Sequence, residues 1–317
     1  MKQNKLQKMK QKGFTLLELL VVITLLAILS VGALVAYEGI GENAEAVGAA
    51  NSIKTADSSI RTFRAVEGVY PNQWDNLVSV DDGTANNFIA DQTKAFIAPL
   101  NLVAVATDPT LAAKIGNALN SVGINEFQSL LSTATFTNTN PNEAWNESAP
   151  GVSIPADELE LAADGTVEYA GAAPTAANLS VFASGAAGTC TVGGQDLKAA
   201  VGGDLTDSTR LNRINDTLDN DGCHLVVALG FGKDVPGTTI DSRVAISTAP
   251  TYVSKNINPS VNYARYIALL HLGSADEDGA TPTVIQAEDI RAQAKLIAVV
   301  DTEGRAIDES IAGAYQQ

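Results

Sequence analysis

The feature that most constrains this chain is an apolar run near its N-terminus, from Phe14 to Ala36. Its 23 residues include one charge, Glu18, and only three other polar side chains. A helix rises ~1.5 Å per residue, so a helix of this length reaches roughly 34 Å, enough to cross a hydrocarbon core of about 30 Å. The run therefore predicts one membrane-spanning helix.

The residues before the run set its orientation. Residues 1–13 hold five lysines and no acid, and the positive-inside rule keeps such a flank in the cytoplasm. The rest of the chain then lies outside. The whole chain has 20 Lys and Arg against 36 Asp and Glu, so from Phe14 onward the formal net charge is −21. A surface of this charge argues against nucleic acid as a partner.

Two other kinds of N-terminal segment are the alternatives: an ordinary secretory signal and a plain signal anchor. A secretory signal has an uninterrupted apolar core of about 7–15 residues and then a small-residue cleavage site. Here a carboxylate sits at the fifth residue of the run, and the helical pattern continues past the apolar part. A lipoprotein signal is excluded because the first cysteine is Cys190.

Glu18 is the residue of the run that needs an explanation. An ionisable group inside a bilayer is costly and usually has both a function and a partner. Lys12 is the nearest cation in the sequence, and cleavage after Gly13 would add the α-amino group of Phe14, mostly protonated at neutral pH. Two staggered helices can bring this amine against Glu18 of a neighbour, so geometry favours pairing between molecules. A favourable position in the helix dipole is the alternative.

Residues 12–23, with the sequence KGFTLLELLVVI, resemble the class III signal of type IV prepilins and of the pseudopilins of type II secretion. The resemblance implies cleavage between Gly13 and Phe14 by a membrane-embedded prepilin peptidase, N-methylation of Phe14, and a role for Glu18 in subunit assembly. Val35 stands where many members of the family carry a helix-kinking proline, so a straighter helix is expected.

The resemblance also implies partners and a location. The partners are other copies or related pilin subunits in a helical filament, an inner-membrane assembly platform, and membrane lipid before assembly. The chain would first be a single-pass protein of the inner membrane with a cytoplasmic N-terminus. It would then become part of an extracellular or periplasmic filament.

The helix is expected to continue beyond the membrane. No proline occurs between Phe14 and Pro71, and apolar residues recur at spacings of three and four, which is the pattern of one buried helical face. They are Val47, Ala50, Ile53, Ala56, Ile60, Phe63 and Val66. Gly68 and Pro71 then end the helix.

The sequence thus divides into a leader at 1–13, a long helix at 14–66 whose part 14–36 is membrane or filament core, and a head at 67–317, as one domain or two lobes. Short apolar runs between turn residues predict strands in the head, so the expected fold class is α+β with a mainly antiparallel sheet. Candidate strands are residues 165–169, 179–183, 225–231, 243–247 and 295–301. Candidate helices are residues 109–132, interrupted at Gly123, 263–272 and 287–293.

Cys190 and Cys223 are the only cysteines of the chain. Outside the cytoplasm such a pair is more often a disulfide than two thiols, and no Cys-x-x-Cys spacing indicates metal or redox chemistry. We expect a disulfide, with two buried thiols as the alternative.

Residues 216–222, with the sequence DTLDNDG, concentrate three carboxylates. Asp216, Asp219 and Asp221 offer the oxygen ligands that calcium prefers. The spacing does not fit an EF-hand, and no glutamate follows at the right distance, so a solvated turn is the preferred interpretation. No other cofactor is expected.

The sequence holds no motif of a known catalytic site. It lacks a Gly-x-Ser-x-Gly elbow, a Walker A loop, a His-Glu-x-x-His pair and a dinucleotide fingerprint. The expected function is therefore structural and non-enzymatic: a prepilin of a type IV pilus-like filament. A type II secretion pseudopilin is the alternative, and a membrane-anchored exported enzyme is the second class of function.

Overall fold

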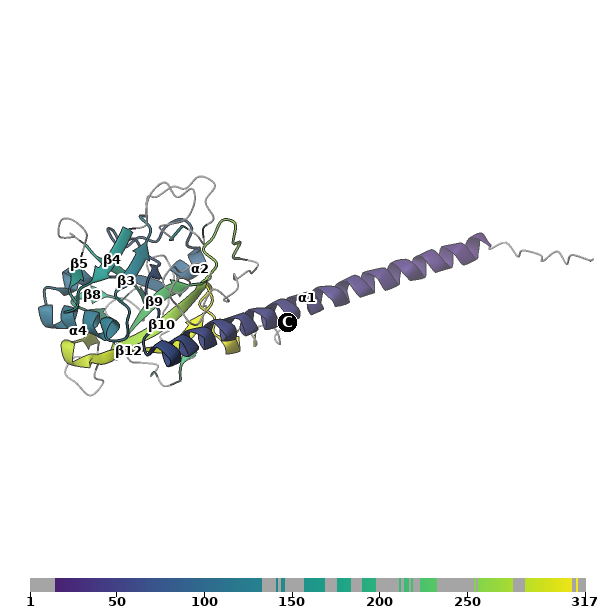
Figure 1. The fold of residues 1–317 in the computed structure, drawn as a ribbon. Helices are drawn as coiled ribbons and strands as arrows, with labels where there is room; N and C mark the ends of the chain where they lie inside the picture. Colours follow the sequence, from purple (N-terminus) through teal and green to yellow (C-terminus); the bar gives the residue numbers. More distant parts are fainter. Residues whose placement is uncertain are drawn as a thin grey trace, which may run out of the picture.

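The structure is a computed structural model of the chain. It describes residues 15–132, 141, 144–145, 157–168, 176–183, 190–197, 211, 214–216, 218, 223–232, 254, 256–275, 283–309 and 312. A long helix, α1, projects from a head built around β-sheet, and only the C-terminal half of this helix lies against the head (Figure 1).

Helix α1 spans Leu16–Glu67, 52 residues, which is about 78 Å at the usual rise. Thr15 caps its N-terminus, and Gly68 ends it in the left-handed region at φ 79°, where glycine has no Cβ penalty. The helix passes Val35 without a break. The long unbroken helix that the sequence predicts is therefore present.

The C-terminal half of α1 packs on the head along one face. Its buried residues follow the predicted spacing of three and four, and they are Ala50, Ile53, Ala56, Ile60 and Phe63. Val47 and Val66, predicted on the same face, are instead 56% and 50% exposed, because they lie at the two ends of the covered stretch. Each large apolar side chain buried in this way contributes about 1.5–3 kcal/mol, so the covered face holds the helix to the head.

The turn after α1 fastens the end of the helix. Tyr70 donates its N–H to the carbonyl of Val122 at 2.7 Å, and its hydroxyl accepts the N–H of Leu296 at 3.1 Å. The Arg64 guanidinium donates to the same hydroxyl and lies 4.4 Å from the centre of the ring. The Tyr-Pro turn therefore joins the last turn of α1 to two separate parts of the head.

Nine strands of the described residues form the main sheet, in the order β12-β10-β9-β1-β3-β4-β5, with β6 pairing to both β9 and β2. They are β1 Trp74–Asn76, β2 Ile97–Asn101, β3 Glu126–Ser129, β4 Asp157–Leu161, β5 Val167–Glu168, β6 Asn178–Phe182, β9 His224–Phe231, β10 Tyr266–Ser274 and β12 Ile290–Val300. The pair β1 and β3 is parallel and the other pairs are antiparallel. The predicted α+β class with a mainly antiparallel sheet is confirmed.

The other described elements are short. A second sheet has the order β11-β7-β8. Its strands are β7 Thr191–Val192, β8 Gln195–Asp196 and β11 Val284–Ile285. The helices are α2 Asp91–Lys94, α3 Leu102–Val105, α4 Pro109–Asn120 and the 3-10 helix η2 Ala287–Asp289.

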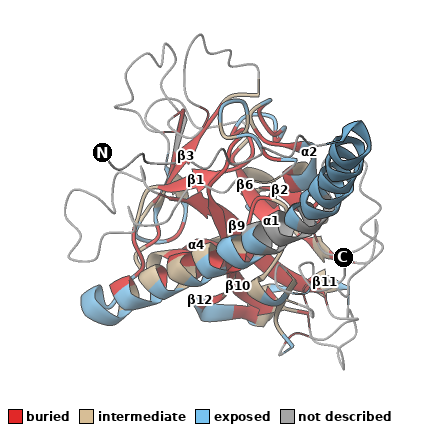
Figure 2. Ribbon diagram, turned by 90° about the vertical axis from the view of Figure 1, so that its right-hand side faces the viewer, coloured by how far each residue is buried: buried red, intermediate tan, exposed pale blue. Residues whose placement is uncertain are grey.

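The central strand β9 is buried on both faces. Val227 and Leu229 belong to the apolar cluster that includes α1 and α4, whereas Val226 and Ala228 belong to a cluster on the other face with Trp145. Figure 2 shows these buried central strands together with the outer, exposed face of α1. A strand covered on both faces reads as a continuous apolar run, which explains the sequence of β9.

A buried ion pair ties β1 to the segment before β10. Asp75 Oδ2 lies 2.6 Å from a terminal nitrogen of Arg265 and accepts the hydroxyl of Tyr263 at 2.7 Å. Burial, and after it the charge of Asp75, raises the pKa of Tyr263 well above its ordinary value. A Cβ placed on Gly230 would lie 1.9 Å from the Tyr263 hydroxyl, so the close approach of this group requires glycine.

Several predicted elements of the head are wrong. The helix of 109–132 ends at Asn120, because Gly123 turns the chain at φ 85° and β3 follows. Residues 263–272 were expected to be helical, but 266–274 form β10, whose neighbours β9 and β12 pair with its two edges. Residues 287–293 hold only η2 before β12 begins at Ile290, five residues before its predicted start.

The remaining candidate strands fall into two groups. Residues 179–183 and 225–231 are strands within one residue of the expected bounds, and 165–169 contains the shorter β5. Residues 243–247 lie outside the described residues.

Candidate functional site at the N-terminal end of the long helix

Thr15 and Glu18 form a capping box at the start of α1. The N–H of Thr15 donates to Glu18 Oε2 at 3.0 Å, and the Thr15 hydroxyl donates to the same oxygen at 2.9 Å. In return, the N–H of Glu18 donates to Thr15 Oγ1 at 3.2 Å. These bonds satisfy two of the four N–H groups that every helix leaves unpaired at its start.

The capping box fixes where the only charge of the apolar run lies. The Glu18 carboxylate is folded back onto Thr15 at the end of the helix where the dipole is positive, which favours the ionised form. Its Oε1 accepts no hydrogen bond from the residues that the structure describes. One carboxylate oxygen is therefore held in place, and the other can receive a cation.

The sequence motif predicts a functional role for Glu18 but not for Thr15. The signal was available, because Thr15 and Glu18 have the Thr-x-x-Glu spacing of a capping box directly before an apolar run. Gly13 and Phe14 lie outside the described residues. Cleavage between them and N-methylation of Phe14 therefore stay predictions, as does the role of Glu18 in assembly.

Helix α1 is uncovered from Leu16 to Leu34. Leu16–Leu34 is the one helix segment of the described residues that is long and apolar enough to cross a membrane, and none of it is buried. Its two other hydroxyls beyond Thr15 donate to the helix itself, Thr24 to the carbonyl of Val21 at 2.9 Å and Ser30 to that of Leu26 at 2.7 Å. A surface that is apolar all round needs lipid or other apolar helices as its surroundings.

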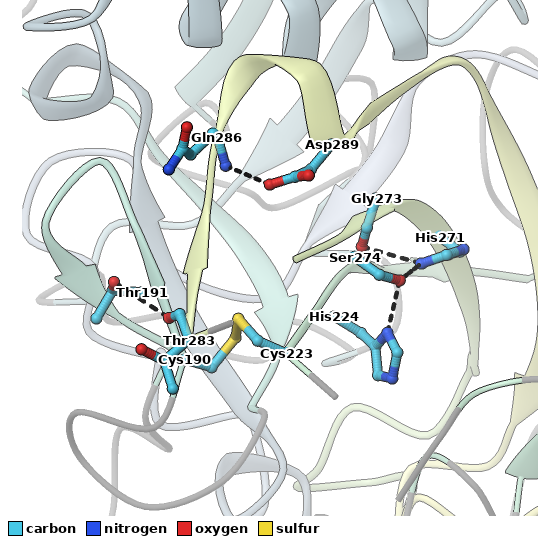
Figure 3. The surroundings of a disulfide bond; sticks show 10 residues. All are labelled: Cys190, Thr191, Cys223, His224, His271, Gly273, Ser274, Thr283, Gln286 and Asp289. Carbon is cyan, nitrogen blue, oxygen red and sulfur yellow. Dashed lines mark hydrogen bonds between the residues drawn. A yellow bond between two sulfur atoms is a disulfide. The ribbon is translucent and has the colours of Figure 1, made fainter. Parts of the chain in front are cut away.

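The disulfide between Cys190 and Cys223 is present, as the sequence predicts. Cys190 directly precedes β7 of the small sheet, and Cys223 directly precedes β9 of the main sheet. The bond therefore joins the two sheets (Figure 3).

Two histidines and a serine form a hydrogen-bonded chain beside this disulfide (Figure 3). His271 Nε2 lies 2.9 Å from the carbonyl of Gly273 and 2.9 Å from Ser274 Oγ. Since a carbonyl only accepts, Nε2 carries the proton, and Ser274 in turn donates to His224 Nδ1 at 2.6 Å. Burial, and after it the nearby charges of His224 and Arg291, lowers the pKa of His271 to about 4.

Ser274 donates to His224 Nδ1 as a serine nucleophile would donate to its base. The two imidazoles are only 5% and 7% exposed, so this contact is closed to a substrate. The arrangement instead joins β9 to β10 at the end where the disulfide lies.

The calcium hypothesis is not supported by a described cluster. Asp216 is exposed, whereas Asp219 and Asp221 lie outside the described residues. Within the described part of the chain, no group of three or more His, Cys, Asp and Glu side chains is arranged to hold a metal ion. Calcium binding at this segment stays a prediction from the sequence.

Comparison with known proteins gives one match, at the N-terminus. The family model of the prokaryotic N-terminal methylation motif matches residues 8–34. This motif is the class III signal peptide of type IV pilins and pseudopilins. No curated protein and no solved structure matches the chain.

The match confirms the resemblance of residues 12–23. It indicates a pilin-like or pseudopilin precursor that is anchored in a membrane, which is a structural kind of protein. It also implies processing by a prepilin peptidase and assembly with other pilin subunits.

Proposed function

We propose that this chain is a structural subunit of a type IV pilus-like filament. A prepilin peptidase cleaves it between Gly13 and Phe14 and methylates the new N-terminus, and the subunits then assemble through α1. The observation that carries the proposal is the contrast within α1: Leu16–Leu34 has no covered residue, whereas the second half of the same helix is packed on the head. The two halves of such a helix therefore need different surroundings.

The apolar half has two environments available in turn. Before assembly, lipid surrounds Leu16–Leu34, whose 19 residues span roughly 28 Å, close to the thickness of a hydrocarbon core. The five lysines of the leader keep the N-terminus in the cytoplasm and place the head outside. On assembly, the same surfaces of neighbouring subunits replace the lipid.

Glu18 supplies the electrostatic part of assembly. Cleavage leaves a protonated amine on Phe14, directly before Thr15. In a filament of staggered helices, the amine of one subunit meets the Glu18 carboxylate of the next in apolar surroundings, where an ion pair is strong. The oxygen of Glu18 that Thr15 does not hold is the acceptor for this amine.

The head supports an extracytoplasmic location. Its disulfide suits an oxidising compartment, and the formal net charge of −21 after the leader favours solubility outside the cell. In the filament the heads form the outer layer, because each is held only on the second half of α1.

The test is to delete the gene and to label the parent cells with an antibody raised against the head. We expect the antibody to decorate surface filaments of the parent, and both filaments and label to be absent from the deletion strain. The proposal of a pilus subunit is wrong if filaments persist without the chain. It is also wrong if the label stays in the envelope while the deletion abolishes export of secreted proteins. The second result would identify a secretion pseudopilin.

A further inference from the structure

A basic stripe lies on the last strand of the main sheet. Arg291, Gln293 and Lys295 are exposed at alternate positions of β12. We call these three residues the β12 stripe. Within the described part of the chain, neither Arg291 nor Lys295 has an ion-pair partner. The stripe therefore presents two cations that no described carboxylate pairs with, on a strongly acidic protein.

An open pocket adjoins the β12 stripe. It has a volume of about 600 Å³ and is lined by Ser121, Arg291, Ala292 and Gln293. The Ser121 hydroxyl lies 3.1 Å from the carbonyls of both Ala118 and Ala292, so it links the end of α4 to the wall of the pocket. A protruding acidic side chain that enters here meets the Arg291 guanidinium.

Among the described residues, no acid forms an ion pair with the β12 stripe. From Ile290 to Val300 the strand contains no acid. Asp289, just before the strand, accepts the N–H of Gln286 at 2.8 Å (Figure 3), and Glu288 beside it is exposed. His271, which pairs with Lys295 in the sheet, is uncharged at neutral pH, because its pKa is lowered to about 4 by burial and by neighbouring charges that include both cations of the stripe.

A row of three glutamates lies at the opposite end of the same sheet. Glu126 of β3 pairs with Glu160 of β4, and Glu160 pairs with Glu168 of β5. We call these residues the glutamate row. Directly paired residues of antiparallel strands lie on one face, and like charges there repel. Glu160 and Glu168 are exposed, and no cation of the described residues pairs with any of the three.

Glu126 is the positioned member of the row. Its Oε1 accepts the side-chain amide of Gln73 at 2.7 Å, and its Oε2 accepts that of Asn72 at 3.3 Å. These amides donate hydrogen bonds but carry no charge, so they hold the carboxylate in place without neutralising it. The row therefore remains a negatively charged surface for a partner that carries cations.

We propose that the β12 stripe of one subunit binds the glutamate row of a second copy of this chain. The inference rests on the proposed function, because it requires subunits that the helices bring side by side. β12 and β5 are the first and last strands in the order of the main sheet. A contact between two different surfaces is heterologous, and its repetition adds subunits in a line or helix instead of closing a dimer. The charges thereby fix which neighbour each head contacts.

Charge reversal tests the pairing. One variant combines Arg291→Glu with Lys295→Glu, another combines Glu160→Lys with Glu168→Lys, and a third carries all four changes. Reversal of two cations turns attraction into repulsion at this contact, so it is expected to lower the yield of sheared filaments by about tenfold, which corresponds to about 1.4 kcal/mol. The fourfold variant restores attraction and returns the yield to that of the parent. Asp81→Lys, at an exposed site outside both surfaces, leaves the yield unchanged.

All changed side chains are exposed, so folding is checked separately by the midpoint of thermal unfolding of each purified variant. A parent that forms no filaments overturns the proposed function itself. If the parent forms filaments and both reversed variants give the same yield as the parent, only the proposed contact is overturned. Loss in both reversed variants without recovery in the fourfold variant shows that the two surfaces have other partners, which also overturns it.

Cross-linking tests the same contact in unmodified filaments. A carbodiimide joins an amine to a carboxylate without a spacer, so it should link Lys295 to Glu160 or Glu168. Filaments grown from a mixture of ordinary and nitrogen-15-labelled chains show by mass whether the two peptides come from different copies. A cross-link between Lys295 of one label and Glu160 or Glu168 of the other label supports the contact. Other cross-links between copies, in the absence of this one, contradict it.

Discussion

The contacts of Thr15 with Glu18 concern two surroundings of one carboxylate, the membrane boundary and the proposed contact with a neighbouring subunit. In the precursor, the Thr15 N–H and hydroxyl hold one oxygen of the Glu18 carboxylate, so part of its hydrogen-bonding capacity is satisfied within its own helix. This reduces the cost of placing the carboxylate at a membrane boundary. In the proposed function, the other oxygen accepts the amine of a neighbouring subunit.

The first prediction concerns Glu18→Ala. The cleavage position precedes the helix in sequence, and the apolar run is kept, so the variant is inserted and cleaved like the parent. Filaments are absent, because the amine of each subunit loses its acceptor. Immunoblots of membranes for the cleaved chain and electron microscopy of sheared fractions measure the two effects. Thr24→Val, which removes a hydroxyl from the same run, is the control, and normal filaments in the Glu18 variant would sink the charge-pairing account.

The second prediction concerns pH and His271. The folded chain holds the pKa of this imidazole at about 4, below the ordinary value of 6.5, so the unfolded chain binds the proton more readily. Stability from this group is complete above pH 6.5 and falls by about 3 kcal/mol as the pH drops towards 4. Denaturant unfolding at several pH values measures it. His271→Gln should flatten the loss over this range, and an equally steep loss in the variant would refute the assignment.

At the scale of elements, what the sequence predicts depends on how local the signal is. Helix α1 was predictable because its caps, its apolar run and its spacing of three and four lie within one segment. Strand β10 was predicted as a helix because it is covered on both faces and has no alternation of apolar and polar residues. The contact of Asp75 with Arg265 joins residues 190 positions apart, so no pattern in the sequence indicates it.

In the candidate site, too, local features were predictable from the sequence and long-range contacts were not. Glu18 and the position of processing were indicated by the motif itself, and Cys190 and Cys223 were indicated as a pair by their number and compartment. The Ser274 contacts with two histidines were not foreseen, because they depend on the register between β9 and β10, which pairs His224 with Ser274. The β12 stripe and the glutamate row likewise become visible only once the strand order is known.

The third prediction concerns the buried ion pair at β1. Gly230→Ala places a Cβ 1.9 Å from the hydroxyl of Tyr263, which Asp75 and the surrounding core hold in position. Overpacking of this kind is expected to lower the free energy of unfolding by about 3 kcal/mol. Gly48→Ala is the control, since a Cβ there meets nothing within 4 Å on the exposed side of α1, and it should raise stability by about 1 kcal/mol. Equal unfolding midpoints for the two variants would contradict the account.

At the scale of the whole molecule, α1 serves as one continuous rod with two kinds of surroundings. From Leu16 to Leu34 it is exposed, and in the proposed function lipid and then neighbouring helices surround this part. Its C-terminal half belongs to the core of the head, and Tyr70 fastens the end of the rod to the sheet. The head can therefore move with the helix as one body when the subunit leaves the membrane.

The fourth prediction concerns the bond between the two sheets. Replacing Cys190 and Cys223 with serine opens a loop of 33 residues, which costs about 3–4 kcal/mol in the chain-entropy model. Chemical denaturation of the detergent-solubilised chain in oxidised and reduced form measures the loss. The reduced parent should match the double serine variant, and unequal stabilities of these two would show that the effect comes from the serines instead.

The most direct test of the central claim is the intact mass and N-terminal sequence of the chain recovered from sheared surface filaments. The account predicts a chain that begins at Phe14 with one methyl group on its amine. A chain that begins at Met1, or after Ser30 or Ala36, would contradict it, because the methylation motif would then not direct the processing of this protein.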